Sequence, residues 1–192
     1  MDDANICDVD DASEMKTIII PESCFKGRRR RGVKNKEKLP PKEKKKRVVS
    51  TEKRWKNHIT DEDLAADLDG LWDHENNTTK QIVHREIKRK LDGYKRQDIE
   101  KQLFDEHAFV TLDNVVELLR TSPNCFYCQK KVKLLYEVAR DPEQWTLERI
   151  SNDTGHNFGN VEISCLSCNI RRRTMYHEKY RFTKQVQIIP LK

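Results

Sequence analysis

The chain lacks any long run of apolar residues, and it has little apolar material overall. Of its 192 residues, 35% are hydrophobic, 7% are aromatic and 36% are charged. Without a signal peptide or a transmembrane run, we expect a protein of a reducing, intracellular compartment and no association with membranes. So few apolar residues predict a modest core, in one compact domain or two very small ones, with part of the chain unfolded.

An excess of either charge sign is also absent from most of the chain, although the formal net charge is +6. Residues 1–25 carry seven acidic and one basic side chain, whereas residues 26–47 carry thirteen basic and two acidic ones. The remaining residues, 48–192, are almost neutral. Any basic binding surface on the folded part is therefore expected to be local.

Residues 1–50 are predicted to form a disordered tail, acidic at first and then basic, because they show no sustained hydrophobic periodicity. Within this tail, residues 17–21 form a short extended patch that is able to dock on another surface. The basic run 28–47 is compatible with a nuclear localisation signal, with a tether for nucleic-acid phosphates, or with a solvated linker. These three alternatives stay open from the sequence.

Residues 51–121 are predicted to be mainly helical. Thr60 and Asp63 have capping-box spacing, and apolar residues at 64, 68, 71 and 72 follow on one helical face. A longer helix carries its apolar side at residues 82, 83, 87, 91 and 94, with Gly93 as its weakest point. A further element follows Thr111–Asn114. The histidines of this region are predicted to be structural rather than ligands.

Six cysteines are present, and four of them form two CxxC pairs separated by 36 residues: Cys125 with Cys128, and Cys165 with Cys168. Two such pairs are a strong signal for zinc, because each turn directs both sulfurs at one ion and four thiolates complete a tetrahedral shell. Two disulfides in a secreted domain are the alternative, which the lysine-rich, charge-rich composition disfavours. A closed site of this kind stabilises a fold and leaves no position open for catalysis.

Between the two pairs, the order of elements is readable. Residues 145–150 and 161–164 alternate apolar and polar side chains, as half-buried strands do, and the polar loop 152–160 joins them. A helix is predicted to start at the second pair and to run to Thr174. The expected fold class is α+β: a ββα unit on a treble-clef-like zinc site over residues 122–177, followed by a C-terminal extension, 178–192.

The pattern Cys125-x-x-Cys128…Leu147-Glu-Arg-Ile150…Asn160-Val-Glu-Ile-Ser-Cys165-x-x-Cys168-Asn169 resembles the zinc-containing HNH (ββα-metal, or His-Me finger) endonucleases, in the branch of phage recombination endonuclease VII. HNH-like proteins in which an acidic-Arg-Ile element replaces the usual acidic-His pair are familiar from phages and large DNA viruses. The resemblance covers about residues 123–175. It implies a metal-dependent endonuclease acting on duplex, nicked or branched DNA, with a homodimer as an option. With the run 28–47, it implies a nuclear, virus-factory or virion location.

Carried over by position, Glu148 and Asn169 correspond to the ligands of a catalytic Mg²⁺ or Mn²⁺, which favours oxygen donors. Asn160 corresponds to the middle asparagine, which braces the loop by bonds to its backbone. Arg149 stands where the resemblance places the general-base histidine. A guanidinium cannot accept a proton at neutral pH, so this position departs from the family.

Two accounts of Arg149 follow. Either it clamps the scissile phosphate while His156, in the intervening loop, accepts the proton, or the site does not cleave and the zinc module binds or packages DNA. For His156, a local structural role is the competing interpretation. The helix that follows presents three arginines, of which one or two are expected to contact flanking phosphates: Arg171, Arg172 and Arg173.

Overall fold

The computed structural model describes residues 17–21, 44–72 and 77–191. It shows a mixed α+β protein with a small antiparallel sheet, so the predicted fold class is confirmed at that level. The predicted basic run up to residue 43 lies outside the described residues, as do Cys7 and Cys24.

The last residues of the predicted tail, 45–50, pack on the folded body. Lys46 forms a β-bridge with Val138, and Arg47 is buried. The Arg47 guanidinium pairs with Glu86, donates a hydrogen bond of 2.8 Å to the carbonyl of Tyr136, and lies 4.1 Å from the centre of that ring. The end of the basic run is therefore part of the fold. The partners of Arg47 lie 39 and 89 residues away in the sequence, so no local sequence pattern predicts them.

Four short helices come next: α1 (Val48–Thr51), α2 (Lys53–His58), α3 (Asp61–Ala65) and α4 (Leu68–Trp72). The predicted capping box at Thr60 is confirmed, since its hydroxyl and the Asp63 carboxylate each accept a backbone N–H of the other residue. The single apolar helical face predicted here is divided into α3 and α4. The chain is extended at Ala66, and the Asp67 side chain accepts the backbone N–H of Gly70 at 3.0 Å, which starts the new turn.

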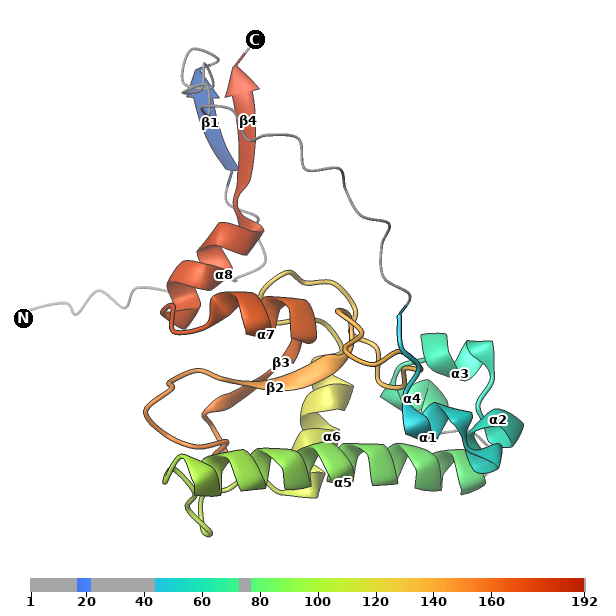
Figure 1. The fold of residues 1–192 in the computed structure, drawn as a ribbon. Helices are drawn as coiled ribbons and strands as arrows, with labels where there is room; N and C mark the ends of the chain where they lie inside the picture. The colour runs from blue at the N-terminus through green and yellow to red at the C-terminus, as the bar shows by residue number, and fades with distance from the viewer. Residues whose placement is uncertain (1–16, 22–43, 73–76, 192) are drawn as a thin grey trace, which may run out of the picture.

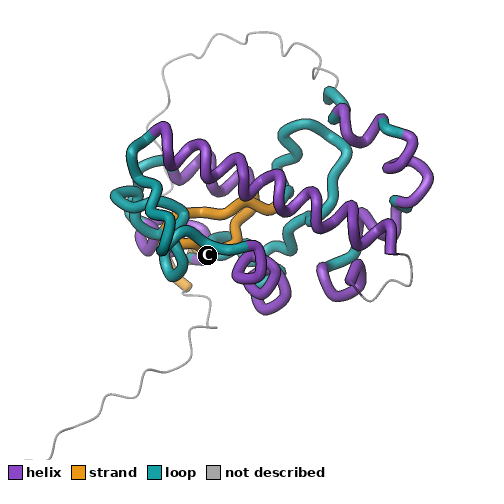
Figure 2. The backbone as a smooth tube through the Cα atoms, turned by 90° about the horizontal axis from the view of Figure 1, so that it is seen from below, coloured by secondary structure: helices purple, strands orange, loops and turns teal. Residues whose placement is uncertain are grey.

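Helix α5 (Asn77–Glu100) is the longest helix, and it continues through Gly93 without a break. Its buried side chains include Ile82, Val83 and Ile87. The helix packs against α6 (Leu112–Thr121), which starts with a second capping box, as the spacing of Thr111–Asn114 allows. Figures 1 and 2 show α5 lying lengthwise alongside the small sheet. Among the helices of the described residues, none combines the length and the apolar character needed to span a bilayer.

The ββα unit consists of β2 (Trp145–Arg149), β3 (Val161–Cys165) and α7 (Leu166–Arg172). The strands are antiparallel, with Trp145 opposite Cys165 and Glu148 opposite Glu162. Contrary to the half-buried pattern predicted for β2, its polar residues Thr146 and Glu148 are buried as well. Helix α7 packs against both strands, and it supplies hydrogen-bond partners that make this burial tolerable.

The chain ends with α8 (His177–Gln185) and β4 (Gln187–Leu191). Strand β4 pairs in parallel with β1 (Thr17–Pro21), in register from Thr17 opposite Gln187 to Pro21 opposite Leu191. The extended patch predicted near the N-terminus therefore docks on the chain's own C-terminal strand. Figure 1 shows this pair standing beyond α8, away from α5.

Candidate functional site

The cysteines of the two CxxC pairs come together in space. One sulfur from each of Cys125, Cys128, Cys165 and Cys168 lies within 4.8 Å of all the others, and the Sγ atoms of Cys128 and Cys165 are 4.0 Å apart. Tetrahedral zinc with bonds of about 2.3 Å separates its sulfurs by roughly 3.8 Å. All four cysteines are free thiols. The cluster is therefore compatible with a metal such as zinc.

Backbone geometry sets the positions of these sulfurs. The turn Cys125–Cys128 closes at Gln129, whose φ of 58° is left-handed. The backbone N–H of Phe126 donates to the carbonyl of Ile163 in β3 at 2.8 Å, which ties the turn to the sheet. Cys165 ends β3 and Cys168 lies in the first turn of α7. A metal bound here would join the turn, the sheet and the helix.

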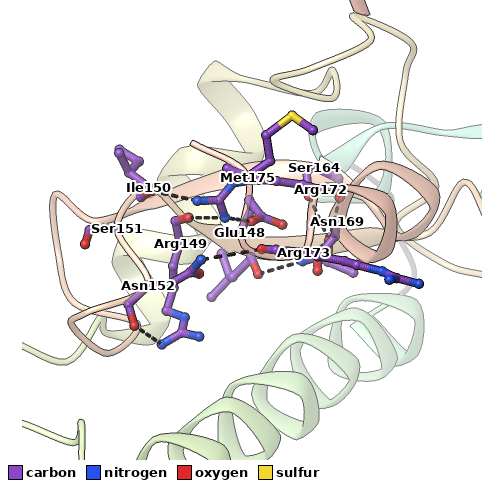
Figure 3. Close-up of polar contacts among 12 residues, drawn as sticks. Glu148, Arg149, Ile150, Ser151, Asn152, Ser164, Asn169, Arg172, Arg173 and Met175 are labelled. Carbon is purple, nitrogen blue, oxygen red and sulfur yellow. Dashed lines mark hydrogen bonds and ion pairs between the residues drawn. The ribbon is translucent and has the colours of Figure 1, made fainter. Parts of the chain in front are cut away.

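A cleft of about 610 Å³ lies between α5 and the ββα unit. One face of α5 forms one wall, with Lys90, Gly93, Tyr94 and Gln97, and Lys101 lies directly after the helix. The opposite wall includes four of the residues predicted to be catalytic, namely Glu148, Arg149, His156 and Asn169, together with Arg173. Figure 3 shows α5 passing beneath the side chains of β2 and α7. The structure thus gathers these residues around one space, whereas Asn160 does not line it.

Glu148 is buried, with 5% of its surface exposed. Its Oε1 forms an ion pair with Arg172, and its Oε2 is fully buried without a hydrogen-bond partner in the described residues. Burial raises the pKa of Glu148 to about 7, although Arg172 and Arg149 act in the opposite direction. The carboxylate therefore has one buried oxygen that no described residue satisfies.

Arg172 is buried as well, with 3% exposed, so the prediction that it contacts flanking phosphates does not fit this structure. Besides Glu148, its guanidinium donates to the carbonyls of Arg149 and Ile150, at 2.8 Å each, and to that of Met175 at 2.9 Å (Figure 3). The helical phase of α7 turns this residue toward β2 and leaves Arg171 and Arg173 exposed. Of the three arginines, Arg171 and Arg173, the C-cap residue of α7, are therefore the exposed ones.

The Arg149 guanidinium lies at the loop after β2. Its Nη1 donates to the carbonyl of Thr154 at 3.0 Å and to that of Asn152 at 3.4 Å. Its other nitrogens form no hydrogen bond with any residue that the structure describes. Because Arg149 lines the cleft, these donors are available to an anionic ligand there.

Asn169 presents an oxygen in the same cleft. Its Nδ2 donates to Thr146 Oγ1 at 3.2 Å and to the carbonyl of Leu147 at 3.3 Å, and its Oδ1 accepts nothing from the described residues. The free oxygens of Asn169 and Glu148 fit a hard divalent cation. In the described residues, only the cysteine cluster groups three or more typical metal ligands, and Glu148 belongs to no such group there.

Asn160 makes the bonds that a loop brace requires. Its Oδ1 accepts the backbone N–H of Ser151 at 2.9 Å. Its Nδ2 donates to the carbonyls of Ser151 and Gly155, at 3.1 and 2.9 Å, and to Thr154 Oγ1 at 2.7 Å. The loop that carries His156 is thereby held to the end of β2.

His156 is buried against α5, where it meets a partner that sequence reasoning missed. Its Nδ1 lies 2.9 and 3.0 Å from the two carboxylate oxygens of Asp98, and its backbone N–H donates to Asp98 Oδ2 at 2.6 Å. Burial lowers the pKa of His156, while Asp98 opposes that shift. One signal was available: Asp98 continues the apolar face of α5 at helical spacing from Leu91 and Tyr94, where an acidic residue needs a buried partner.

Gly155 allows the loop that carries His156 to lie close to Asp98 and Leu103. A Cβ at this position would lie 2.5 Å from the carbonyl oxygen of Leu103 and 2.8 Å from Asp98 Oδ2. We expect Gly155→Ala to lower the free energy of unfolding by about 1–3 kcal/mol, because backbone and a buried carboxylate must move. Urea unfolding measures this change.

Gly93→Ala is the matched control. A Cβ at residue 93 would meet nothing within 4 Å, and the residue lies inside α5. Alanine there is expected to stabilise the protein by up to about 1 kcal/mol, because glycine is a poor helix former. If Gly155→Ala were as stable as the unmodified protein, this result would contradict the close approach of the loop to α5.

Comparison of the chain with models of protein families, with curated proteins and with solved structures finds no match. The likeness to the HNH endonucleases therefore consists of the motifs within residues 123–175.

Proposed function

We propose that the protein is a metal-dependent endonuclease that hydrolyses DNA phosphodiester bonds in the cleft between α5 and the ββα unit. One observation carries the proposal. Glu148, Arg149 and Asn169, which stand at site positions of the motif, line that cleft together with His156, the alternative base in the intervening loop. The lining also includes Lys101 and other cationic side chains, whereas its carboxylate, Glu148, is already paired with a buried arginine. Such a surface favours a phosphate-bearing substrate.

Glu148 Oε2 and Asn169 Oδ1 are the protein oxygens that would hold Mg²⁺ or Mn²⁺. When bound, the cation offsets the charge that builds on the phosphate and on the leaving 3′ oxygen. Both ligands are oriented beforehand. Arg172 fixes the Glu148 carboxylate, and the bonds of the Asn169 amide nitrogen to β2 fix which of its two polar atoms faces the cleft.

In this proposal, Arg149 binds a non-bridging oxygen of the scissile phosphate. Its bonds to the loop carbonyls orient the guanidinium, so little reorganisation accompanies the reaction. Because Arg149 remains protonated, the proton of the attacking water must go elsewhere. His156 supplies the acceptor in the same cleft, and its lowered pKa keeps it neutral at neutral pH.

The cysteine cluster is assigned a structural zinc ion. Four thiolates would leave no coordination position for substrate, so its contribution is to the fold. Cys168 is followed directly by Asn169. Zinc would therefore hold the start of α7, and with it a ligand of the catalytic cation.

A plasmid-nicking assay with and without Mg²⁺ or Mn²⁺ tests the proposed function. Cleavage should require the cation, and Glu148→Ala should reduce the rate by about 100-fold or more. Glu162→Ala is the matched control, because Glu162 faces Glu148 across the strand pair and does not line the cleft. Metal-independent cleavage, or equal rates for the two variants, would contradict the assignment.

A zinc module that binds or packages DNA without cutting it is the second candidate. Arg149 favours it, since the position that the motif gives to the base holds a group unable to accept a proton. Fluorescence anisotropy with labelled duplex, nicked and branched DNA separates the two. Binding of these ligands, with no cleavage of any of them in Mg²⁺ or Mn²⁺, would support this second function.

A further inference from the structure

Asp98 and His156 form a buried pair that links α5 to the loop between β2 and β3. Asp98 is fully buried, and both of its carboxylate oxygens contact the histidine. One of them, Oδ2, also accepts the backbone N–H of His156. The two residues lie 58 positions apart in the sequence.

This geometry favours one tautomer of the imidazole ring. Asp98 Oδ2 already accepts the backbone N–H of His156, and a proton on Nδ1 lets the same carboxylate accept from the ring as well. The lone pair of neutral His156 then resides on Nε2. That nitrogen has no hydrogen-bond partner in the described part of the chain, nor is it among the atoms sealed from solvent there. His156 lines the cleft, which makes Nε2 the ring atom available to a proton.

The surroundings hold the ring in place. The Tyr94 ring packs on it, with 4.5 Å between ring centres, and the Tyr94 hydroxyl accepts the backbone N–H of Leu147 at 3.1 Å. The charged groups around the imidazole are Asp98 and Lys101 from the α5 side and Arg149 from β2. The two cations disfavour the imidazolium, whereas Asp98 stabilises it.

We propose that Asp98 is a positioning residue of the hydrolytic site, which makes His156 Nε2 the proton acceptor and gives α5 a part in the reaction. The proposal rests on the proposed function. As a water oxygen forms its bond to phosphorus and the bond from phosphorus to the 3′ oxygen breaks, the water proton passes to Nε2. The 3′ oxygen takes a proton from solvent, and the imidazolium later returns one to solvent. Asp98 stabilises the positive charge of the imidazolium until that proton is released.

Asp98→Asn tests this role with little change of shape. The asparagine oxygen can still accept the backbone N–H of His156, but its NH₂ group donates to Nδ1 and forces the proton onto Nε2. We expect cleavage to slow by about 10²–10⁴-fold. The double variant with His156→Ala should be no slower than His156→Ala alone, because the two residues act as one unit. Asp92→Asn, the same change at an exposed position of α5, is the control.

Two further readouts separate positioning from a merely structural role. The ¹⁵N shifts of the His156 ring should report the Nδ1–H tautomer in the unmodified protein and the Nε2–H tautomer in Asp98→Asn. The rate of the unmodified protein should fall with acid as His156 protonates, below its ordinary pKa of 6.5, and this limb should be absent in His156→Ala.

An Nε2–H tautomer in the unmodified protein would overturn the proposal, and this measurement needs no variant to fold. A near-normal rate for Asp98→Asn would overturn it while leaving the proposed function intact. A slow Asp98→Asn enzyme that keeps the Nδ1–H tautomer would also overturn it. Failure of the unmodified protein to cleave any DNA would remove both the proposed function and this role.

Discussion

Removal of the metal from the four-cysteine cluster is expected to unfold the ββα unit. Structural zinc sites contribute about 10–16 kcal/mol in zinc-finger peptides, and whole domains are stable by only about 5–15 kcal/mol. The cluster joins the turn at Cys125–Cys128 to the end of β3 and the start of α7, so loss of the metal separates three segments at once. Chelator-treated protein should lose part of its far-UV circular dichroism signal and its cooperative melting transition.

Cys165→Ser should have the same effect, because it removes one thiolate from the shell. Cys24→Ser is the matched control, since Cys24 belongs to neither CxxC pair. Metal analysis of the purified protein should give about one zinc per chain, and none for the Cys165→Ser variant. Native melting behaviour after complete removal of the metal would show that the cluster does not stabilise the fold.

Arg172→Ala is expected to destabilise the protein by about 3–5 kcal/mol, because it leaves the buried Glu148 carboxylate without its partner. It also removes three hydrogen bonds to backbone carbonyls at the end of β2 and after α7. Arg171→Ala and Arg173→Ala, at exposed positions of the same segment, should change the unfolding free energy by no more than about 0.5 kcal/mol. Urea unfolding of the three variants measures the difference.

The loss of stability caused by Arg172→Ala should depend on pH. Burial already raises the pKa of Glu148 to about 7, from an ordinary value of 4.5, and without Arg172 that pKa rises further. The folded variant then holds a proton that the unfolded chain has released, so its stability falls as pH increases from about 4.5. Arg172→Ala should therefore be less destabilising at pH 5 than at pH 8. The double variant Glu148→Gln with Arg172→Met should recover part of the loss. Equal stability of Arg172→Ala and Arg171→Ala would contradict the buried pair.

Local features of this protein were predictable from sequence because their causes lie within a few residues. The CxxC pairs, the capping boxes at Thr60 and Thr111, and the strands after residue 144 follow from spacing and alternation. The continuity of α5 through Gly93 was less apparent, since the penalty for a helical glycine is only about 1 kcal/mol and packing overrides it.

Local sequence did not predict which of the three arginines after Asn169 is buried. Their sequence is the same basic run, yet Arg172 is buried in an ion pair while its neighbours are exposed. The phase of a short helix against β2 makes that distinction, and no residue type in the run marks it. Arg47 is a similar case, because its position in a basic run predicts a solvated side chain, whereas Glu86 and Tyr136 bury it.

By itself, the sequence determined the cysteine cluster, the α+β class and the candidate catalytic residues on one wall of the cleft, because short-range spacing specifies turns, strands and helix ends. Only the tertiary structure decided which polar groups are paired inside. Asp98 with His156 and Glu148 with Arg172 join residues 58 and 24 positions apart. A buried charge must find a partner, but many partners satisfy that demand, and packing of α5 and α7 against the sheet selects one.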